Sequence, residues 1–424
     1  MHDLRMIREE PGALRDMLER RGQLDSLGGL VDRAEELDRE RRRLIVLVEE
    51  RKAARNASTQ EVARLRRAGE PADELIAASR ALGDEISAMG EELASVEDEL
   101  GRLLLELPNV PLAEVPAGGE ENNVIVRDWG GPRSSDGVRP HWEIAERLGM
   151  LDLERASKIS GSGFAVYRGR GARMVRALLS YFLDVHSEEH GYEEIWPPAL
   201  VTRATMTGTG QLPKFEDDAY AIRDDDLFLI PTAEVPVTNL YRDEVLDAEQ
   251  LPMAFTAYTP CFRREAGSAG KDTRGVLRTH QFDKVELVRY STPERSRDEL
   301  EVLTGHAESM LRRLGLPYRV KLLAAGDTGF SSAMTYDLEV WAPGVGSWLE
   351  VSSCSNFGDF QARRAGLRYR PAKGEKPRFL HTLNGSGLAF PRIIACILEH
   401  YQNADGSVTV PEVLRPYIGL EVLG

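Results

Sequence analysis

The chain of 424 residues has few of the features that mark secreted or membrane proteins. Its three cysteines, Cys261, Cys354 and Cys396, lie far apart, and no two of them form a C-x-x-C pair. This spacing argues against a disulfide framework, predicts no zinc site and fits a reducing cytoplasm. The sequence has no apolar run of about 18 residues, and its charged N-terminus lacks the apolar core of a signal peptide. We therefore expect a cytoplasmic protein without a membrane span.

The sequence also lacks the glycine-rich loops that commonly bind nucleotides. It contains no G-x-x-x-x-G-K-[ST], and no G-x-G-x-x-G follows a predicted strand. The net charge is −15, so no overall positive field attracts nucleic acid, and a nucleic-acid partner would need a local basic patch. Nucleotide chemistry in this chain would therefore require another kind of site.

The first hundred residues predict two long helices that pair. Apolar residues recur in alternating steps of four and three along the second helix, at Leu82, Ile86, Met89, Leu93, Val96, Leu100, Leu103 and Leu107. A weaker seam runs along the first helix, at Leu30, Ala34, Leu37, Leu44 and Val48. Gly69 and Pro71 separate the helices. The pattern predicts an antiparallel coiled coil with about 30 to 38 residues per arm, at about 1.5 Å per residue.

Charge is uneven on this predicted hairpin. Between residues 51 and 67, six basic residues stand against the single acid Glu61: Arg51, Lys52, Arg55, Arg64, Arg66 and Arg67. The second helix is mainly acidic. Two interpretations stay open from the charges alone, a solvated helix face and a projecting arm that follows a phosphate backbone.

From Val110 onward the pattern is that of an α+β domain, so we expect domains at residues 1–109 and 110–424. Residues 113–136 are predicted as a linker, and residues 161–171 as a strand and turn. The predicted helices are 172–189, 295–314 and 389–401. Further predicted strands are 227–230, 254–261, 279–288, 319–323, 334–341 and 347–352. Because strands and helices do not alternate, an antiparallel sheet with flanking helices is expected.

Residues 260–286 carry the strongest functional signal. They begin with Arg263, Arg264 and Glu265, pass through a loop rich in glycine and charge, and return through Phe282 and Glu286. Such a β-loop-β hairpin offers a guanidinium for phosphate oxygens, a ring for stacking on a base and acids for amine donors. A surface hairpin with solvated charges remains the alternative.

Five short segments follow the predicted arm in order. They are IWPPALV (195–201), PTAE (231–234), FRRE (262–265) with the returning strand, EVSSCSN (350–356) and NGSGLAFPR (384–392). Together they resemble the motifs of class II aminoacyl-tRNA synthetases, and within that class those of bacterial-type seryl-tRNA synthetases. The resemblance covers essentially the whole chain. It implies an antiparallel-sheet catalytic domain, and a homodimer whose interface includes the first segment with Trp196.

The resemblance implies an ATP site and an amino-acid site. The catalytic residues would be Arg263 on the α-phosphate, Arg392 on the γ-phosphate, and Glu350. Phe282 would stack on adenine, Glu265 would accept a hydrogen bond from the adenine amino group, and the backbone of Thr279 would contact the nucleotide. The full implied ATP set is Arg263, Arg264, Glu265, Thr279, Phe282, Glu350, Val351, Ser352, Ser353 and Arg392. The implied serine set is Thr232, Ala233, Glu234, Arg263, Glu286 and Ser386.

Magnesium is the implied cofactor, held with ATP by the oxygens of Glu350 and Ser353. His280 is interpreted as a strand histidine, and Cys354 as a packing residue because no histidine partner lies near it in the motif. The implied function is serine–tRNA ligation: L-serine reacts with ATP to give seryl-adenylate and pyrophosphate, and serine then passes to the 3′ end of tRNA(Ser). The family also implies tRNA(Sec) as a substrate where that tRNA exists.

Three alternatives remain open at this point. The chain could be a related ligase for another amino acid, a ligase that loads a carrier protein, or a catalytically inert coiled-coil scaffold. The long arm disfavours the carrier-loading type, and the PTAE and EVSS segments disfavour another amino acid. Intact Arg263, Glu350 and Arg392 argue against the scaffold.

Overall fold

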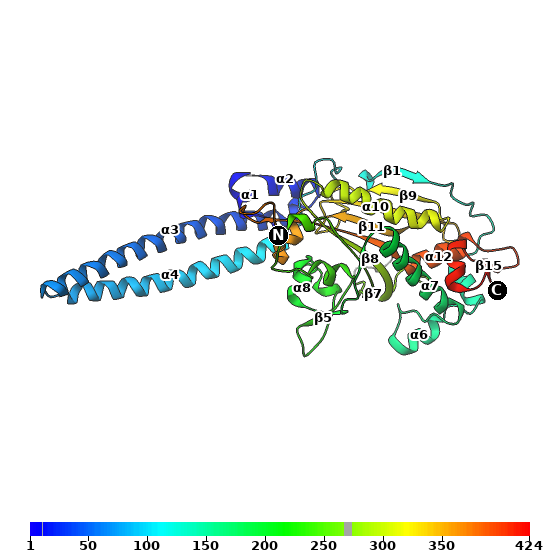
Figure 1. The fold of residues 1–424 in the computed structure, drawn as a ribbon, viewed down its shortest axis with the longest axis horizontal. Helices are drawn as coiled ribbons and strands as arrows, with labels where there is room; N and C mark the ends of the chain where they lie inside the picture. The colour runs from blue at the N-terminus through cyan, green and yellow to red at the C-terminus, as the bar shows by residue number, and fades with distance from the viewer. Residues whose placement is uncertain (11, 267–273) are drawn as a thin grey trace. The chain divides into compact units, whose positions relative to one another are not determined.

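The computed structural model describes residues 1–10, 12–266 and 274–424. The chain forms two compact units, Met1–Leu107 and Pro108–Gly424 (Figure 1). Residues 267–273, which belong to the loop expected to be rich in glycine and charge, lie outside the described residues. The division into functional domains at 1–109 and 110–424 stays a prediction.

The N-terminal unit is helical. Its helices are α1 (Leu4–Glu9), α2 (Ala13–Arg20), α3 (Leu24–Ala68) and α4 (Asp73–Glu106). Helix α3 has 45 residues, more than the predicted arm, because it begins before Leu30 and its first turns pack on α2. It ends where predicted, at Gly69, whose φ of 74° is a left-handed conformation that favours glycine. Pro71 precedes the cap residue Ala72 and so lies just outside α4.

Helices α3 and α4 lie side by side and antiparallel (Figure 1). The predicted seams face inward: Leu37, Leu44 and Leu100 are buried. Three ion pairs between the helices have residue numbers that rise on one helix as they fall on the other: Arg33–Glu99, Arg41–Glu97 and Arg51–Glu85. These pairs are exposed and each contributes little, so the apolar seam supplies most of the association.

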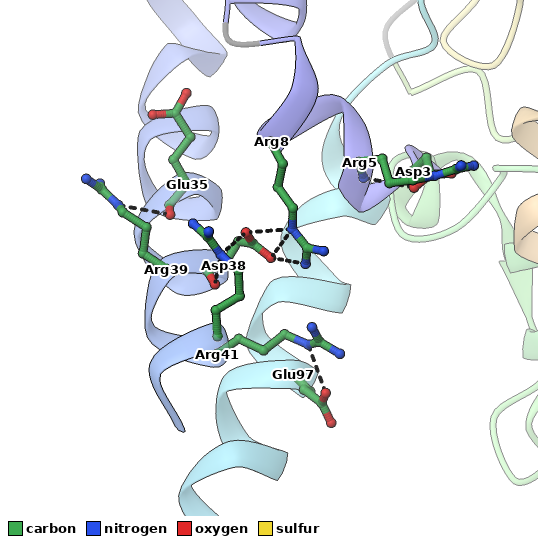
Figure 2. Close-up of polar contacts among 9 residues, drawn as sticks. Asp3, Arg5, Arg8, Glu35, Asp38, Arg39, Arg41 and Glu97 are labelled. Atoms are coloured by element: carbon green, nitrogen blue, oxygen red, sulfur yellow. Dashed lines mark hydrogen bonds and ion pairs between the residues drawn. The ribbon is translucent and has the colours of Figure 1, made fainter. Parts of the chain in front are cut away.

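A buried carboxylate joins the short N-terminal helix to the long one. Asp38 on α3 is 1% exposed and accepts hydrogen bonds from Arg8 on α1, at 2.5 Å from Nη2 and 3.0 Å from Nε (Figure 2). Desolvation alone would raise the pKa of Asp38, but the bonds and charge of Arg8 outweigh it and hold that pKa below its ordinary value. The ionised pair therefore fixes α1 against α3.

The C-terminal unit is built on an eight-stranded sheet with the strand order β1-β9-β10-β11-β14-β8-β7-β2. All neighbours are antiparallel except β2 and β7. The strands are β1 (Val124–Trp129), β2 (Glu193–Glu194), β7 (Met253–Phe262), β8 (Gln281–Ser291), β9 (Tyr318–Leu322), β10 (Met334–Ala342), β11 (Ser347–Asn356) and β14 (His381–Ala389). The prediction of an antiparallel sheet flanked by helices is confirmed.

Three amphipathic helices complete the main core of this unit. Helices α7 (Arg170–Asp184), α10 (Ser296–Arg313) and α12 (Phe390–His400) contribute to one apolar cluster with the sheet. A π-helical turn, η2 (Val185–Glu189), continues α7. The predicted helices agree with these bounds to within a few residues, because each has a clear apolar face.

Shorter elements surround the sheet. The helices are α5 (His141–Arg147), α6 (Leu153–Ser160), α8 (Arg203–Gly208), α9 (Glu234–Thr238), α11 (Phe360–Ala365) and α13 (Arg415–Ile418), and the single turns are η1 (Glu120–Asn122), η3 (Glu216–Asp218), η4 (Ala248–Gln250) and η5 (Glu412–Leu414). The small-sheet strands are β3 (Leu200–Thr202), β4 (Tyr220–Ala221), β5 (Leu227–Leu229), β6 (Val245–Asp247), β12 (Arg368–Arg370), β13 (Arg378–Phe379), β15 (Val408–Thr409) and β16 (Val422–Leu423).

The structure corrects two sequence predictions and contains strands that were not predicted. The predicted linker 113–136 contains β1, which forms by pairing with the distant β9. Of the strand and turn predicted at 161–171, the turn is present, but the strand is reduced to one isolated bridge at Tyr167, and α7 begins at Arg170. Strand β14, not predicted, lies between β11 and β8. In each case partners far away in sequence decide the structure.

Candidate active site

A cavity lined by both polar and apolar residues opens beside the central strands. Its volume is about 590 Å³, and a smaller cavity of about 80 Å³ adjoins it. The two share a wall of six residues: Arg263, Glu265, Arg278, Lys284, Glu350 and Ser386. These residues come from the β7–β8 hairpin, β11 and β14, so neighbouring strands of the sheet bring together segments that are far apart in sequence.

Most of the predicted site residues line these cavities. Those of the implied ATP set that line the smaller cavity are Arg263, Glu265, Thr279, Phe282, Glu350, Val351 and Arg392. Those of the implied serine set that line the larger cavity are Thr232, Glu234, Arg263, Glu286 and Ser386. Ser353 also lines the larger cavity. The nucleotide and amino-acid sets thus fall on adjoining cavities.

Three predicted residues do not line either cavity. Ala233 is fully buried in an apolar cluster. The Ser352 hydroxyl is buried and donates to the Ser386 carbonyl at 2.7 Å, so Ser352 supports a cavity residue. Arg264 is exposed, and its backbone N–H donates to the Asp218 carbonyl. Ser352 alternates with Ser353 along β11, so its side chain points away from the larger cavity, whereas Ala233 lies in helical backbone at the start of α9.

The inner end of the larger cavity holds a buried pair of carboxylates. Glu234 begins α9 and Glu286 lies on β8, and both accept a hydrogen bond from Asn384 Nδ2, at 2.9 and 3.1 Å. Lys284 forms an ion pair with Glu286, and its Nζ donates to Thr232 Oγ1 at 3.0 Å. The arrangement presents acceptors and a hydroxyl to the cavity, and it suits a small ligand with an ammonium and a hydroxyl group.

Burial strongly affects the protonation of these acids. Desolvation, followed by the nearby charge of Glu286, raises the pKa of Glu234 to about 7. Desolvation also raises the pKa of Glu286, against the opposing effect of Lys284. Glu234 is therefore about half protonated near pH 7 without a ligand, while Lys284 favours the ionised form of Glu286. A bound cation would displace that proton.

The hairpin places a cation and a ring together. Arg263 directly follows β7, and its guanidinium carbon lies 5.1 Å from the centroid of the Phe282 ring on β8. Glu265 has a φ of 52°, which is unusual for a residue other than glycine, and it forms an ion pair with Arg278 at 3.2 Å. Strained backbone of this kind occurs most often at functional sites.

At the opposite end of the smaller cavity, Arg392 meets Glu350. Arg392 lies in the first turn of α12, and its Nη1 is 2.5 Å from the Glu350 carbonyl and 3.3 Å from Glu350 Oε2. Desolvation alone would raise the pKa of Glu350, but the charges of Arg392 and Arg263 outweigh it and hold that pKa below its ordinary value. Glu350 is therefore ionised, and its oxygens are available as ligands for a cation.

A second acid lies behind this carboxylate. Asp337 on β10 pairs in register with Ser353 on β11 and is 8% exposed. Desolvation and the charge of Glu350 raise the pKa of Asp337 well above its ordinary value. Burial and the charge of Glu350 thus favour the protonated form of Asp337, next to Ser353. Among the described residues, no group of three or more His, Cys, Asp or Glu side chains is arranged to hold a metal.

The sequence reasoning missed several cavity residues. Arg278 lines both cavities, and Lys284 and Asn384 organise the buried acids. Gln361 on α11 donates to Glu234 Oε1 at 2.6 Å. Arg278 and Lys284 lie in the hairpin that carries the strongest signal, so their charge there was an available clue. Gln361 had no such signal, because only the fold brings α11 to the site.

The six basic residues proposed for nucleic acid all lie on α3. Three of them form ion pairs within the arm: Arg51–Glu85, Lys52–Glu49 and Arg64–Glu61. Arg55, Arg66 and Arg67 form no ion pair with any residue that the structure describes. Helices in the described ranges are too short or too polar to cross a bilayer.

Comparison with known proteins decides the family. Residues 1–111 match the model of the seryl-tRNA synthetase N-terminal domain, and residues 214–401 match the tRNA synthetase class II core domain (G, H, P, S and T). The serine–tRNA ligase of Gemmatimonas aurantiaca is 64% identical over 424 residues, which are 100% of both chains. The chain belongs to the seryl-tRNA synthetase family.

Solved structures of this family agree with that conclusion. Seryl-tRNA synthetase from Pyrococcus horikoshii, complexed with ATP, has a TM-score of 0.94 and 38% identity, covering 100% of this chain and 99% of that one. The cytoplasmic enzyme from Naegleria fowleri, in complex with AMP, has a TM-score of 0.88 and 30% identity, with 100% and 98% covered. The predicted class II fold and serine–tRNA ligase function are confirmed.

Proposed function

We propose that the larger cavity binds L-serine, that the smaller one binds the adenine and phosphates of ATP, and that adenylation occurs at their shared wall. The observation that carries this proposal is that Arg263, Glu350 and Ser386 line both cavities. Because the same residues line both cavities, ligands bound in the two cavities have their reacting groups next to each other. Holding two reactants in contact in this way supplies a large part of a rate enhancement.

In the first step, a serine carboxylate oxygen attacks the α-phosphorus, and the bond to the bridging oxygen of pyrophosphate breaks. Negative charge increases on the α-phosphate oxygens in the transition state, and Arg263 is aimed there in advance. Arg392 binds the γ-phosphate. Phe282 supplies the surface for adenine, with Glu265 and the Thr279 backbone at its edge. The electron pair of the broken bond leaves with pyrophosphate.

Serine is recognised at the inner end of the larger cavity. Glu234 and Glu286 accept hydrogen bonds from the serine ammonium. Thr232 and Ser386 complete the polar surface around the hydroxyl of the serine substrate. Lys284 orients Thr232 through its 3.0 Å hydrogen bond. A site that hydrogen-bonds a substrate hydroxyl rejects the analogue lacking it by about 10⁴-fold or more. This chemistry favours serine over alanine.

Magnesium fits the oxygen ligands that Glu350 and Ser353 present to the larger cavity. Glu350 is an ionised carboxylate and Ser353 a hydroxyl, and both line the larger cavity. Mg²⁺ in such enzymes takes one or two protein oxygens and completes its coordination with substrate phosphates and water. Glu350 and Ser353 would hold Mg²⁺, which would neutralise phosphate charge when bound with ATP. Arg392 keeps Glu350 in place through its bond to the carbonyl.

In the second step, the terminal ribose hydroxyl of tRNA(Ser) attacks the activated carbonyl, and AMP leaves. Helical RNA is recognised largely by shape and phosphate contacts, which suits a basic helical arm. We assign this role to Arg51, Lys52, Arg55, Arg64, Arg66 and Arg67, with tRNA(Sec) as a further partner where it exists. The enzyme acts in the cytoplasm as a homodimer, and Trp196, 70% exposed, lies in its interface.

Amino-acid-dependent ATP–pyrophosphate exchange without tRNA tests the adenylation site. We expect exchange with serine and with none of the other nineteen amino acids. Arg263→Ala should lower the exchange rate about 100-fold or more. The neighbouring Arg264→Ala is the matched control, because Arg264 is exposed and lines neither cavity, and it should behave as the unchanged enzyme. Equal losses in both variants would contradict the role of Arg263, and no exchange at all would favour an inert scaffold.

A further inference from the structure

Residue His280 has no part in the proposed chemistry, yet it contacts the backbone of Arg263 twice. The Arg263 N–H donates to the His280 carbonyl at 2.9 Å. In return, His280 Nδ1 lies 3.1 Å from the Arg263 carbonyl. A carbonyl only accepts, so Nδ1 carries the proton in this contact. The two contacts fix the backbone of Arg263, from which its guanidinium reaches the wall shared by the cavities.

His280 is itself held by a loop that follows α6. Its backbone N–H donates to the Gly163 carbonyl at 2.7 Å. The Phe164 ring lies tilted against the imidazole, with centroids 5.3 Å apart. The same loop is tied down farther along, where Val166 accepts from the Asp152 N–H at 2.9 Å. The imidazole therefore lies between a fixed loop and the strand end that carries Arg263.

Gly163 is suited to this contact in two ways. Its φ of 80° lies in the left-handed region, and a Cβ added there would meet His280 Cδ2 at 2.5 Å and Nε2 at 2.7 Å. Real Cβ atoms do not approach other atoms so closely. Any larger residue at 163 must displace the imidazole, and with it the contact to Arg263. Gly161 offers a comparison in the same loop, because its φ is 90° but a Cβ there would meet nothing within 4 Å.

We propose that Gly163 and His280 are positioning residues that hold Arg263 in line with the reacting phosphate. The proposal rests on the role of Arg263 in the proposed function. Misplacement of a catalytic group by about 1 Å can cost about 100-fold in rate. His280 directly precedes β8, so it lies just outside the strand in which the sequence interpretation placed it.

The test compares steady-state ATP–pyrophosphate exchange and thermal unfolding across five variants. His280→Ala and Gly163→Ala should each lower kcat by about 10- to 100-fold, with a smaller change in KM for ATP. His280→Ala should leave the melting temperature close to that of the unchanged enzyme, and His280→Asn, which keeps an N–H donor near the position of Nδ1, should recover most of kcat. Alanine at either glycine is strained by its positive φ, so Gly161→Ala and Gly163→Ala should both lower the melting temperature, but Gly161→Ala, which adds no clash, should keep kcat close to that of the unchanged enzyme.

The double variant Gly163→Ala with His280→Ala separates clash from loop strain. Without the imidazole, the added methyl has room, so the double variant should be no slower than His280→Ala alone. Additive losses in kcat would overturn the proposal. So would a fall in kcat for Gly161→Ala as large as that for Gly163→Ala, or a loss of melting temperature in His280→Ala in proportion to its loss of kcat. If Arg263→Ala abolishes exchange while His280→Ala leaves it unchanged, the positioning role is wrong and the proposed function stands. If Arg263→Ala has no effect, the proposed function itself fails.

Discussion

The buried carboxylate pair predicts that serine affinity depends on pH near neutrality. The pKa of Glu234 is raised to about 7 by desolvation and by the charge of Glu286. The serine ammonium needs an ionised partner, so only the fraction of enzyme with a charged pair is competent to bind it. Serine binding should therefore release a proton, and affinity should rise with pH until Glu234 is fully ionised.

The size of the effect follows from that pKa. With a value of about 7, the charged fraction is about one tenth at pH 6 and about nine tenths at pH 8. The apparent Kd is the intrinsic Kd divided by the competent fraction. The Kd for serine should thus be about tenfold weaker at pH 6 than at pH 8, with little further gain at higher pH.

Isothermal titration calorimetry with serine measures both quantities. Titrations from pH 6 to pH 8 give the Kd, and buffers with different ionisation enthalpies give the number of protons released. Glu234→Gln should remove most of the pH dependence and weaken binding at pH 8. Glu375→Gln, at an exposed position remote from the cavities, is the matched control and should retain it. A Kd for serine that stays constant from pH 6 to pH 8, without proton release, would refute the reasoning.

Three further predictions concern stability and the arm. The folded-state pKa of Glu234 lies above its ordinary 4.5, so its contribution to the stability of the ligand-free enzyme is present below about pH 4.5 and is lost as pH rises through about 7. Glu234→Gln should therefore raise the free energy of unfolding at pH 8 by up to about 3 kcal/mol and change it little at pH 4.5. Urea titrations at the two pH values measure this difference. Replacing Arg66 and Arg67 by Ala should weaken tRNA binding and reduce its salt slope by about 1 to 2 without altering pyrophosphate exchange, whereas Arg64→Ala, whose guanidinium is already paired, should have a smaller effect; equal effects would argue for general charge. Asp38→Asn should lower the unfolding free energy of the N-terminal unit by about 2 kcal/mol, since it breaks a charge-assisted hydrogen bond at a buried group. Urea unfolding monitored by circular dichroism measures this loss, and an unchanged midpoint would contradict the prediction.

The long-range order of the motifs was enough to predict the fold class, the arm and the family. The arm follows from a sustained seam of apolar residues, and such a seam is local information. Helices α7, α10 and α12 were predicted for the same reason. The hairpin residues Arg263, Phe282 and Glu286 were found because a cation, a ring and an acid gather in one short segment.

Local sequence did not determine which residues share a cavity. Ala233 and Ser352 lie within the right motifs, but neither lines a cavity, because Ser352 alternates with Ser353 along β11 and Ala233 packs into an apolar cluster. Strand β1 lies in a segment that was predicted as a linker because its pairing partner is about 190 residues away. Gln361 reaches Glu234 because α11 packs near the site, which no local pattern shows.

The sequence by itself determined the chemical groups of this enzyme, because residue types and motif spacing are encoded along the chain. The tertiary structure decided the protonation of Glu234, the ionisation of Glu350 and the contact between Gly163 and His280. Those properties depend on burial, on charges from other strands and on close approach of distant backbone. They arise only when the sheet brings the segments together.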